Sequence, residues 1–224
     1  VARRAIVGST GELCWLYLTQ QNKGENIIMN KRINMQYGPD GGGCGSEGYP
    51  RLGKPLFLIG FMGVGKSSIA ARLGQLLGVS AREMDDYIEA QVGLSIPEIF
   101  RQRGENFFRE VESAAVAELG GQGPQVISCG GGVPLRQGNV DNMRACGVIV
   151  LLTAAPETIF SRVRHNQNRP LLAGNMNVEY IAQLMEQRRA RYQAAADYQV
   201  STDGKTVEEI CREIVARLSG MAAE

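Results

Sequence analysis

The sequence predicts a three-layer α/β fold in which helices cover both faces of a central parallel sheet of about five strands. Short apolar runs such as "PLFLIG" and "GVIVLLTA" are typical of strands that are buried on both sides. From residue 54 onward these runs alternate with segments whose apolar residues have helical spacing. This alternation favours a parallel sheet between two layers of helices.

The expected elements follow the chain in order. The run at residues 55–60 predicts a strand, and an apolar stripe that ends at Leu77 predicts a helix at 65–77. Ser95, followed by Pro97, indicates the start of another helix. The further expected elements are helices at 85–93, 104–119, 178–196 and 207–218, and strands at 125–128 and 147–154.

The first part of the chain has a different composition. Residues 37–53, "YGPDGGGCGSEGYPRLG", are rich in glycine and cannot bury a core, which is typical of a flexible linker. We therefore expect a disordered leader and linker at 1–53 and a folded domain at 54–224. Met29 and Met35 are alternative starts, and no secretory cleavage site is evident.

Composition excludes several classes of partner and site. Lys and Arg (24) balance Asp and Glu (23) without a basic block, so neither nucleic acid nor an anionic membrane is expected as a partner. Five cysteines without paired spacing favour reduced thiols in the cytoplasm over a disulfide framework or a zinc site. No apolar run reaches the roughly 18 residues of a membrane span.

The stretch "GFMGVGKSS" matches the P-loop pattern, with a strand before it and a helix after it. Glycines let backbone N–H groups surround a β-phosphate, and the following helix N-terminus adds partial positive charge. Lys66 would reach the β- and γ-phosphate oxygens, and the Ser67 hydroxyl would bind Mg²⁺. ATP with Mg²⁺ is therefore expected on the following residues: Gly63, Val64, Gly65, Lys66, Ser67 and Ser68.

The acid that completes the metal site must come from another segment. The strand "QVIS" ends in "CGGG" without a carboxylate, and neither of the GTPase motifs, N-K-x-D and D-x-x-G, is found after the P-loop. The nearest acids are Glu83, Asp85 and Asp86 in "REMDDYIE", although a helix N-terminus alone would favour one or two of them. We expect Asp85 to accept a substrate hydroxyl proton, because the lone His165 is typical of a solvated loop.

Arginines that could bind an anionic substrate lie on two predicted helices. Arg109 and Glu112 in "GENFFREVE" are three residues apart and can pair on one helix face. A carboxylate that orients a guanidinium leaves its fork directed at an anion, although such a pair can also be a weak surface ion pair. "EQRRARY" supplies Arg188, and also Arg189 and Arg191.

Together these motifs resemble the shikimate kinase family. "GFMGVGKSS", the acids before "YIE", "GENFFREVE", "SCGGG", "NRPLL" and "RRARY" occur in that family's order from residue 54 to the C-terminus. The resemblance implies a nucleoside-monophosphate-kinase-like fold with a lid and substrate-binding helical segments. It also implies shikimate as the small-molecule partner.

The resemblance implies roles for individual residues on the acceptor side. Asp85 would hold the acceptor hydroxyl and take its proton, while Arg109 and Arg188 would bind the shikimate carboxylate. Glu112 would orient Arg109. The glycine turn (residues 130–132), with Gly131 at its centre, would approach the substrate ring with bare backbone, which only glycine permits.

On the nucleotide side, the resemblance places Arg169 of "NRPLL" on a lid that touches the transferring phosphoryl group. Arg162 would support the adenine side of this lid, and residues 201–206 would border the adenine. Glu83 stands where the family usually has an aspartate, and it would assist Mg²⁺. An alternative register uses Asp86 as the partner of the hydroxyl.

The expected reaction is transfer of the ATP γ-phosphoryl group to the 3-hydroxyl of shikimate, in aromatic amino-acid biosynthesis. Asp85, Lys66 and Arg169 would be its catalytic residues, in a cytoplasmic monomer. Two alternatives stay open: a kinase of the same build for another small hydroxy acid, and a non-catalytic nucleotide-binding regulator on the same scaffold.

Overall fold

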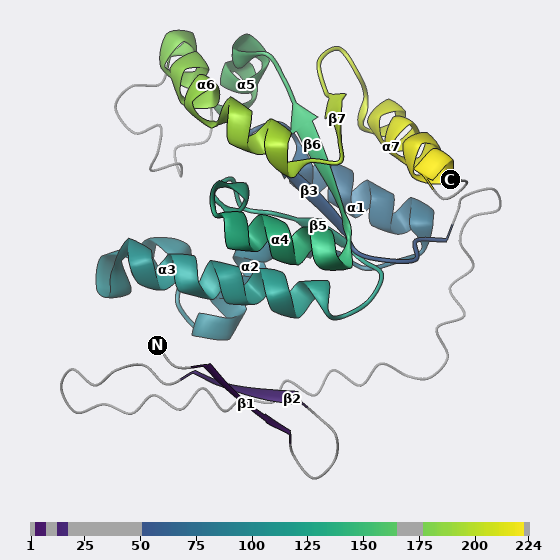
Figure 1. Cartoon of the computed structure of the whole chain (residues 1–224). Coiled ribbons are helices and arrows are strands. Elements are labelled where there is room, and N and C mark those ends of the chain that lie inside the picture. The colour runs from purple at the N-terminus through teal and green to yellow at the C-terminus, as the bar shows by residue number, and fades with distance from the viewer. Residues whose placement is uncertain (1–2, 8–12, 18–50, 165–176, 222–224) are drawn as a thin grey trace. The chain divides into compact units, whose positions relative to one another are not determined.

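The computed structural model describes residues 3–7, 13–17, 51–164 and 177–221, in two compact units, Val1–Gly41 and Gly42–Glu224 (Figure 1). In the first unit, β1 (Arg3–Val7) pairs antiparallel with β2 (Leu13–Tyr17), a pairing that the sequence pattern did not predict. The domain boundary expected at residue 53 stays a prediction. The predictions for His165 and Arg169 fall outside the described residues.

The second unit contains the predicted parallel sheet. Its five strands lie in the order β4-β5-β3-β6-β7, and every neighbouring pair is parallel. The central strand β3 is completely buried, as its apolar sequence predicts. The strands are β3 (Leu56–Gly60), β4 (Ala81–Glu83), β5 (Val126–Ser128), β6 (Val148–Thr153) and β7 (Tyr198–Ser201).

Helices cover both faces of this sheet, so the predicted three-layer α/β fold is confirmed (Figure 1). α1 (Lys66–Leu77) and α7 (Val207–Met221) pack against each other on one face. The other face carries α3 (Ile96–Gly120), α4 (Gln137–Cys146) and α6 (Val178–Ala195). Two shorter helices are α2 (Met84–Val92) and α5 (Pro156–Val163).

Local chemistry explains how the long helix α3 begins and bends. Ser95 is its N-cap, and both the backbone N–H and the hydroxyl of Ser95 contact Glu98 Oε2, at 3.0 and 2.6 Å. Pro97 lies in the first turn, as predicted. At Gly104 the backbone leaves the helical region, with φ of 79°, so the helix expected to begin there is the second part of α3.

The strand order places the predicted motifs at one edge of the sheet. The P-loop follows β3, the glycine turn (residues 130–132) follows the neighbouring β5, and Glu83 is the last residue of β4. The carboxyl ends of parallel strands meet at the same edge, where open α/β sheets bind their ligands. Segments far apart in the sequence are thereby combined into one site.

Candidate active site

The P-loop closes on itself through Lys66. Its Nζ donates hydrogen bonds to the carbonyl oxygens of Gly60 (3.0 Å) and Phe61 (3.1 Å), the first two residues of the loop. Gly63 has φ of 79°, and a Cβ on it would lie 2.6 Å from Val163 Cγ1, so glycine is required there. Ser67 and Ser68 are exposed in the first turn of α1. The loop therefore presents its ammonium, hydroxyl and helix N-terminus together, which suits a phosphate chain.

Arg162 supports the back of the P-loop. Its Nη1 donates to the Val64 carbonyl (3.2 Å) and to Thr202 Oγ1 (3.0 Å), and its Nη2 donates to the Thr202 carbonyl (3.2 Å). The guanidinium thus joins the P-loop to the loop that follows β7. Its described contacts are therefore those of a residue that supports the P-loop, and the predicted role of Arg162 in nucleotide binding stays a prediction.

A carboxylate lies beside the P-loop serine. Glu83 Oε1 is buried and has no hydrogen-bond partner among the described residues. Burial raises the pKa of Glu83, while hydrogen bonds with the hydroxyl groups of Ser128 and Ser67 oppose this rise. A hydroxyl and a carboxylate close to a P-loop are hard oxygen ligands of the kind that Mg²⁺ prefers.

Asp85, at the start of α2, and Glu112 of α3 both lie close to the glycine turn. A Cβ on Gly130 would lie 3.1 Å from Asp85 Oδ1 and 3.3 Å from Glu112 Oε1, so both carboxylates approach the bare backbone. The charge of Asp85 raises the pKa values of Glu83 and of Glu112. Asp86, the alternative residue, is exposed on the same helix turn.

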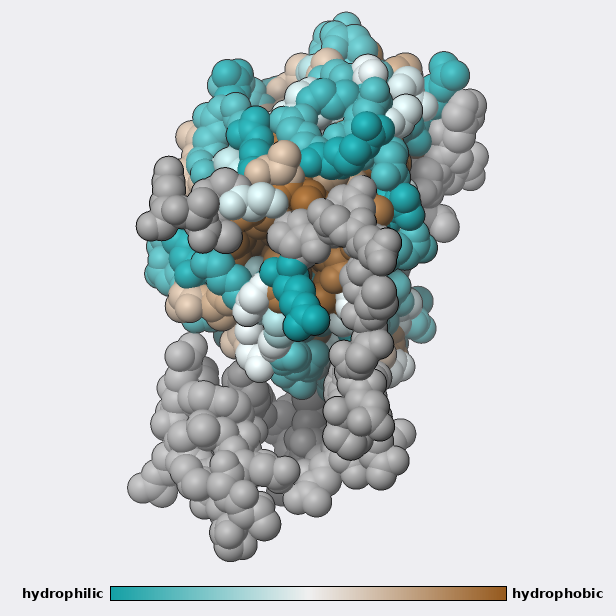
Figure 2. Space-filling model, turned by 90° about the vertical axis from the view of Figure 1, so that its right-hand side faces the viewer, coloured by the Kyte–Doolittle hydropathy of each residue, from teal (hydrophilic) through white to brown (hydrophobic). Residues whose placement is uncertain are grey.

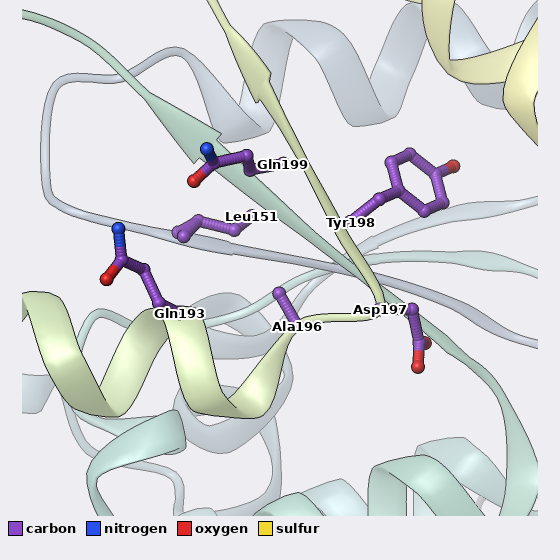
Figure 3. A pocket seen from close by; sticks show the side chains of 6 residues that line it. All are labelled: Leu151, Gln193, Ala196, Asp197, Tyr198 and Gln199. Atoms are coloured by element: carbon purple, nitrogen blue, oxygen red, sulfur yellow. The ribbon is translucent and has the colours of Figure 1, made fainter.

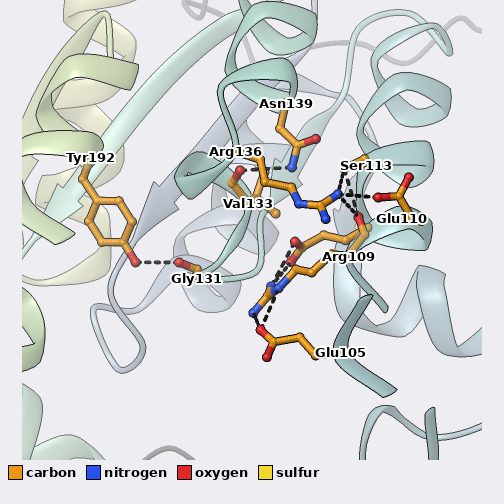
Figure 4. Close-up of polar contacts among 10 residues, drawn as sticks. Glu105, Arg109, Glu110, Ser113, Gly131, Val133, Arg136, Asn139 and Tyr192 are labelled. Carbon is orange, nitrogen blue, oxygen red and sulfur yellow. Dashed lines mark hydrogen bonds and ion pairs between the residues drawn. The ribbon is translucent and has the colours of Figure 1, made fainter. Parts of the chain in front are cut away.

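Arg109 is oriented by carboxylates on both sides, as Figure 4 shows. Its Nη1 lies 3.1 and 3.0 Å from the two oxygens of Glu112, and its Nη2 lies 3.2 Å from Glu105 Oε1. Burial raises the pKa of Glu112, whereas the positive charge of Arg109 opposes this rise. Burial would lower the pKa of Arg109, but Glu112 and Glu105 raise it, so the guanidinium stays charged. A Cβ on Gly132 would overlap the Arg109 guanidinium.

Arg188 approaches the glycine turn from α6. A Cβ on Gly131 would lie 3.9 Å from Arg188 Nη1 and 3.6 Å from the Tyr192 hydroxyl oxygen. Tyr192 donates a hydrogen bond of 2.6 Å to the Gly131 carbonyl, and Arg188 lies over the Phe61 ring, 5.7 Å from its centroid. The predicted Arg109, Arg188, Glu112, Gly131 and Asp85 are therefore brought together around one turn.

Sequence patterns missed the supporting residues of this site. The sequence gives no role to Tyr192 or Phe61, and it places Thr202 only within a loop that borders the adenine, not as the acceptor of hydrogen bonds from Arg162. Tyr192 ends the quoted motif "RRARY" one helical turn after Arg188, and that spacing could have indicated a shared face. Phe61 and Thr202 offer no comparable signal, because their partners are distant in sequence.

In the described part of the chain, one cavity lies beside the P-loop and another lies away from it. One of about 360 Å³ lies between Phe61 and Val64 of the P-loop, the end of β6, and α6. Another of about 300 Å³ is lined by Leu151, Gln193, Ala196, Asp197, Tyr198 and Gln199 (Figure 3). Asp197 precedes β7, so this cavity reaches the sheet edge opposite the P-loop.

Figure 2 shows one face of the molecule, on which apolar residues gather in the middle among polar ones.

Comparison with known proteins gives consistent matches. The family model described as "Shikimate kinase" matches residues 62–219. A shikimate kinase of Geobacter sulfurreducens is 40% identical over 172 residues, which cover 77% of this chain and 94% of that protein. One from Thermus thermophilus is 43% identical over 170 residues, which cover 75% of this chain and 92% of that protein.

The fold is shared as well. A shikimate kinase from Acinetobacter baumannii in complex with shikimate superposes with a TM-score of 0.72 and 27% identity, covering 76% of this chain and 96% of that chain. The resemblance inferred from the motifs is confirmed, as is the predicted fold class.

Proposed function

The chain belongs to the shikimate kinase family and phosphorylates shikimate with ATP, and we propose that the residues around the glycine turn carry this reaction. The observation that supports this most strongly is the convergence of Asp85, Arg109 and Arg188, from three helices, on residues 130–132. A hydroxy acid needs cations for its carboxylate and an acceptor for its hydroxyl proton, and both are present at this turn.

On the acceptor side, Arg109 and Arg188 bind the substrate carboxylate with charge-assisted hydrogen bonds. Glu112 keeps Arg109 in place, as its buried contacts with Nη1 indicate. Asp85 orients the 3-hydroxyl of shikimate and accepts its proton as the phosphoryl group transfers. Gly131 has no side chain, so the substrate ring can approach its backbone. It lies near both Arg188 and the Gly60 carbonyl.

On the nucleotide side, the backbone at residues 63–68 surrounds the phosphates, and Lys66 contacts the β- and γ-phosphate oxygens. Arg162 keeps this backbone in place, and Arg169 contacts the transferring phosphoryl group. Ser67 and Glu83 would hold Mg²⁺, and the unsatisfied buried oxygen of Glu83 fits that role. When bound, Mg²⁺ neutralises charge that develops on the phosphates.

The remaining parts of the proposal concern the assembly and its location. We propose that residues 54–224 form the kinase domain, and that the chain works as a monomer in the cytoplasm without nucleic acid or membrane partners. Among the described residues no helix is long and apolar enough to cross a membrane. Size-exclusion chromatography with light scattering measures the assembly directly, and a dimer mass would contradict the monomer.

The test of function is ADP release from ATP and Mg²⁺ with shikimate, gluconate, quinate or AMP as acceptor. Strong stimulation by shikimate alone is the expected result. Stimulation by gluconate or quinate instead would indicate a different hydroxy acid. No stimulation by any acceptor, with ATP still bound in equilibrium dialysis, would favour the regulator.

A further inference from the structure

Arg136 has no role in the site described so far, yet it lies between two of its parts. It directly follows the short helix η1 (Val133–Leu135), which continues from the glycine turn, and it is the N-cap residue of α4. Its backbone carbonyl accepts hydrogen bonds from Asn139 and Val140 in the first turn of α4. The backbone at Arg136 is therefore fixed relative to the glycine turn.

The side chain of Arg136 reaches across to α3, where it contacts the turn that carries Arg109 (Figure 4). Its Nη1 donates to the Arg109 carbonyl at 3.1 Å and to Ser113 Oγ at 3.3 Å. Ser113 Oγ itself donates to the same Arg109 carbonyl at 2.9 Å. The third partner of Nη1 is Glu110 Oε1 at 2.9 Å.

These partners differ in burial. The Glu110 side chain is 75% exposed, and an ion pair so open to water contributes little. The contacts with Arg109 and Ser113 are half-buried, and the carbonyl lies on the residue whose guanidinium abuts Gly132. Contact with the backbone of Arg109 is therefore the part that can control its position.

A hydrogen bond of Asn139 fixes η1, the segment that joins Arg136 to the glycine turn. The buried Asn139 donates from Nδ2 to the Val133 carbonyl at 3.0 Å, which holds η1 against α4. With η1 fixed in this way, the Arg136 side chain links the glycine turn directly to the backbone of α3. A catalytic or binding group must be held within about 0.5 Å of its productive position, so this link matters for Arg109.

We propose, on the basis of the function proposed above, that Arg136 is a positioning residue for substrate binding. It sets the α3 turn bearing Arg109 and Glu112 at the correct separation from the glycine turn, and it touches no substrate. Its loss then weakens shikimate binding and leaves ATP binding unchanged, because the P-loop is supported separately by Arg162.

The experiment compares Arg136→Gln with Arg144→Gln as the control. Arg144 lies on α4 and also donates to a backbone carbonyl, that of Ala194. Arg136→Gln is expected to raise the KM for shikimate roughly five- to tenfold, with kcat and the KM for ATP within about twofold. Arg144→Gln is expected to leave all three values unchanged. Arg136→Lys is expected to recover part of the loss, because an ammonium can still donate to the carbonyl.

A double-mutant cycle with Arg109→Ala separates positioning from a general structural effect. If Arg136 acts through Arg109, adding Arg136→Gln to Arg109→Ala raises the KM for shikimate little further. An equal further rise in that background would overturn the positioning role, as would an unchanged KM in Arg136→Gln alone. An Arg109→Ala variant with unchanged KM for shikimate would instead overturn the carboxylate-binding assignment itself.

Ser113→Ala gives a second approach that keeps Arg136 intact, for use if Arg136→Gln unfolds. It removes the hydroxyl between Arg136 and the Arg109 carbonyl, so a smaller rise in the KM for shikimate is expected, again without change for ATP. A parallel loss of affinity for ATP in a folded Ser113→Ala would contradict selective positioning of Arg109.

Discussion

Glu112 contacts Arg109 with both carboxylate oxygens, at 3.1 and 3.0 Å from one guanidinium nitrogen, while its side chain is only 2% exposed. Separating this pair would leave the charge of the buried Glu112 carboxylate without a partner, which is strongly unfavourable. The two side chains are therefore held in one geometry. Gly132 lies against the same guanidinium, which fixes the position of Arg109 from the other side.

Gly132→Ala tests this close approach. The new Cβ would overlap the Arg109 guanidinium, and a flexible side-chain end can move away at small cost to folding. We therefore expect a folded enzyme whose KM for shikimate rises about tenfold or more, measured by steady-state kinetics. Gly138→Ala is the matched control, because nothing lies within 4 Å of its Cβ. Equal kinetics for both variants would show that Arg109 does not need its present position.

Arg188→Ala tests the second cation of the substrate site. A charge-assisted hydrogen bond to a carboxylate contributes roughly 1.5–3 kcal/mol, so the KM for shikimate is expected to rise at least about tenfold. Arg189→Ala serves as the control, because Arg189 is exposed and pairs with the equally exposed Glu186. Unchanged saturation by shikimate in Arg188→Ala would remove this residue from the carboxylate site.

The strong elements of the fold were predictable from local pattern, and the weak ones were not. The strands β3 and β6 and the helices α1 and α6 agree with their predicted spans within about two residues. In the five-stranded sheet, the missed strands were β4, with only three residues, and β7, an edge strand. Short strands are defined by pairing with distant neighbours, and such pairing leaves no local pattern.

The site shows the same division. Lys66 and Ser67 belong to one contiguous motif, so the sequence alone located them. Tyr192 and Gly131 are 61 positions apart, and Arg136 and Arg109 are 27 apart. Contacts of this kind depend on the strand order, which no short motif encodes.

Asp85→Asn tests the proton acceptor. The amide keeps the shape of the side chain but cannot take a proton, and we expect kcat to fall about a hundredfold or more. ATP binding, measured by isothermal titration calorimetry, is expected to stay intact. Asp86→Asn, one position along the same turn, is expected to retain activity. A large loss of ATP affinity in Asp85→Asn would place this residue in the metal site, and loss of activity in Asp86→Asn would favour the alternative register.

Removal of residues 1–53 tests the proposed domain boundary. Val1–Gly41 forms a compact unit by itself, and the family match begins only at residue 62. We therefore expect the shortened chain to show unchanged kcat and unchanged KM for both substrates. A folded but slow enzyme, judged by circular dichroism and kinetics together, would show that the removed residues support the kinase.

Asp203 gives a pH-dependent test of the loop that follows β7. Its carboxylate oxygens accept the Ala155 N–H at 3.1 and 2.9 Å and thereby join this loop to the start of α5. Burial alone would raise the pKa of Asp203, but hydrogen bonds from Thr158, Ala155 and Ser201 lower it below the ordinary value of 3.8. A group with such a pKa stabilises the fold at all pH values above 3.8, and this stabilisation disappears as the pH falls through the folded-state pKa.

We therefore expect Asp203→Asn to lower the free energy of unfolding by about 1 kcal/mol at neutral pH. The difference between the variant and the parent chain should shrink as the pH falls from 3.8 through the lower folded-state pKa of Asp203, because the carboxyl group is then protonated and both side chains are uncharged. Urea unfolding followed by circular dichroism measures this difference, with the exposed Asp141→Asn on α4 as the control. A difference that stays constant down to the lowest pH at which the protein folds would mean that the amide, and not the lost charge, disturbs the contact with Ala155.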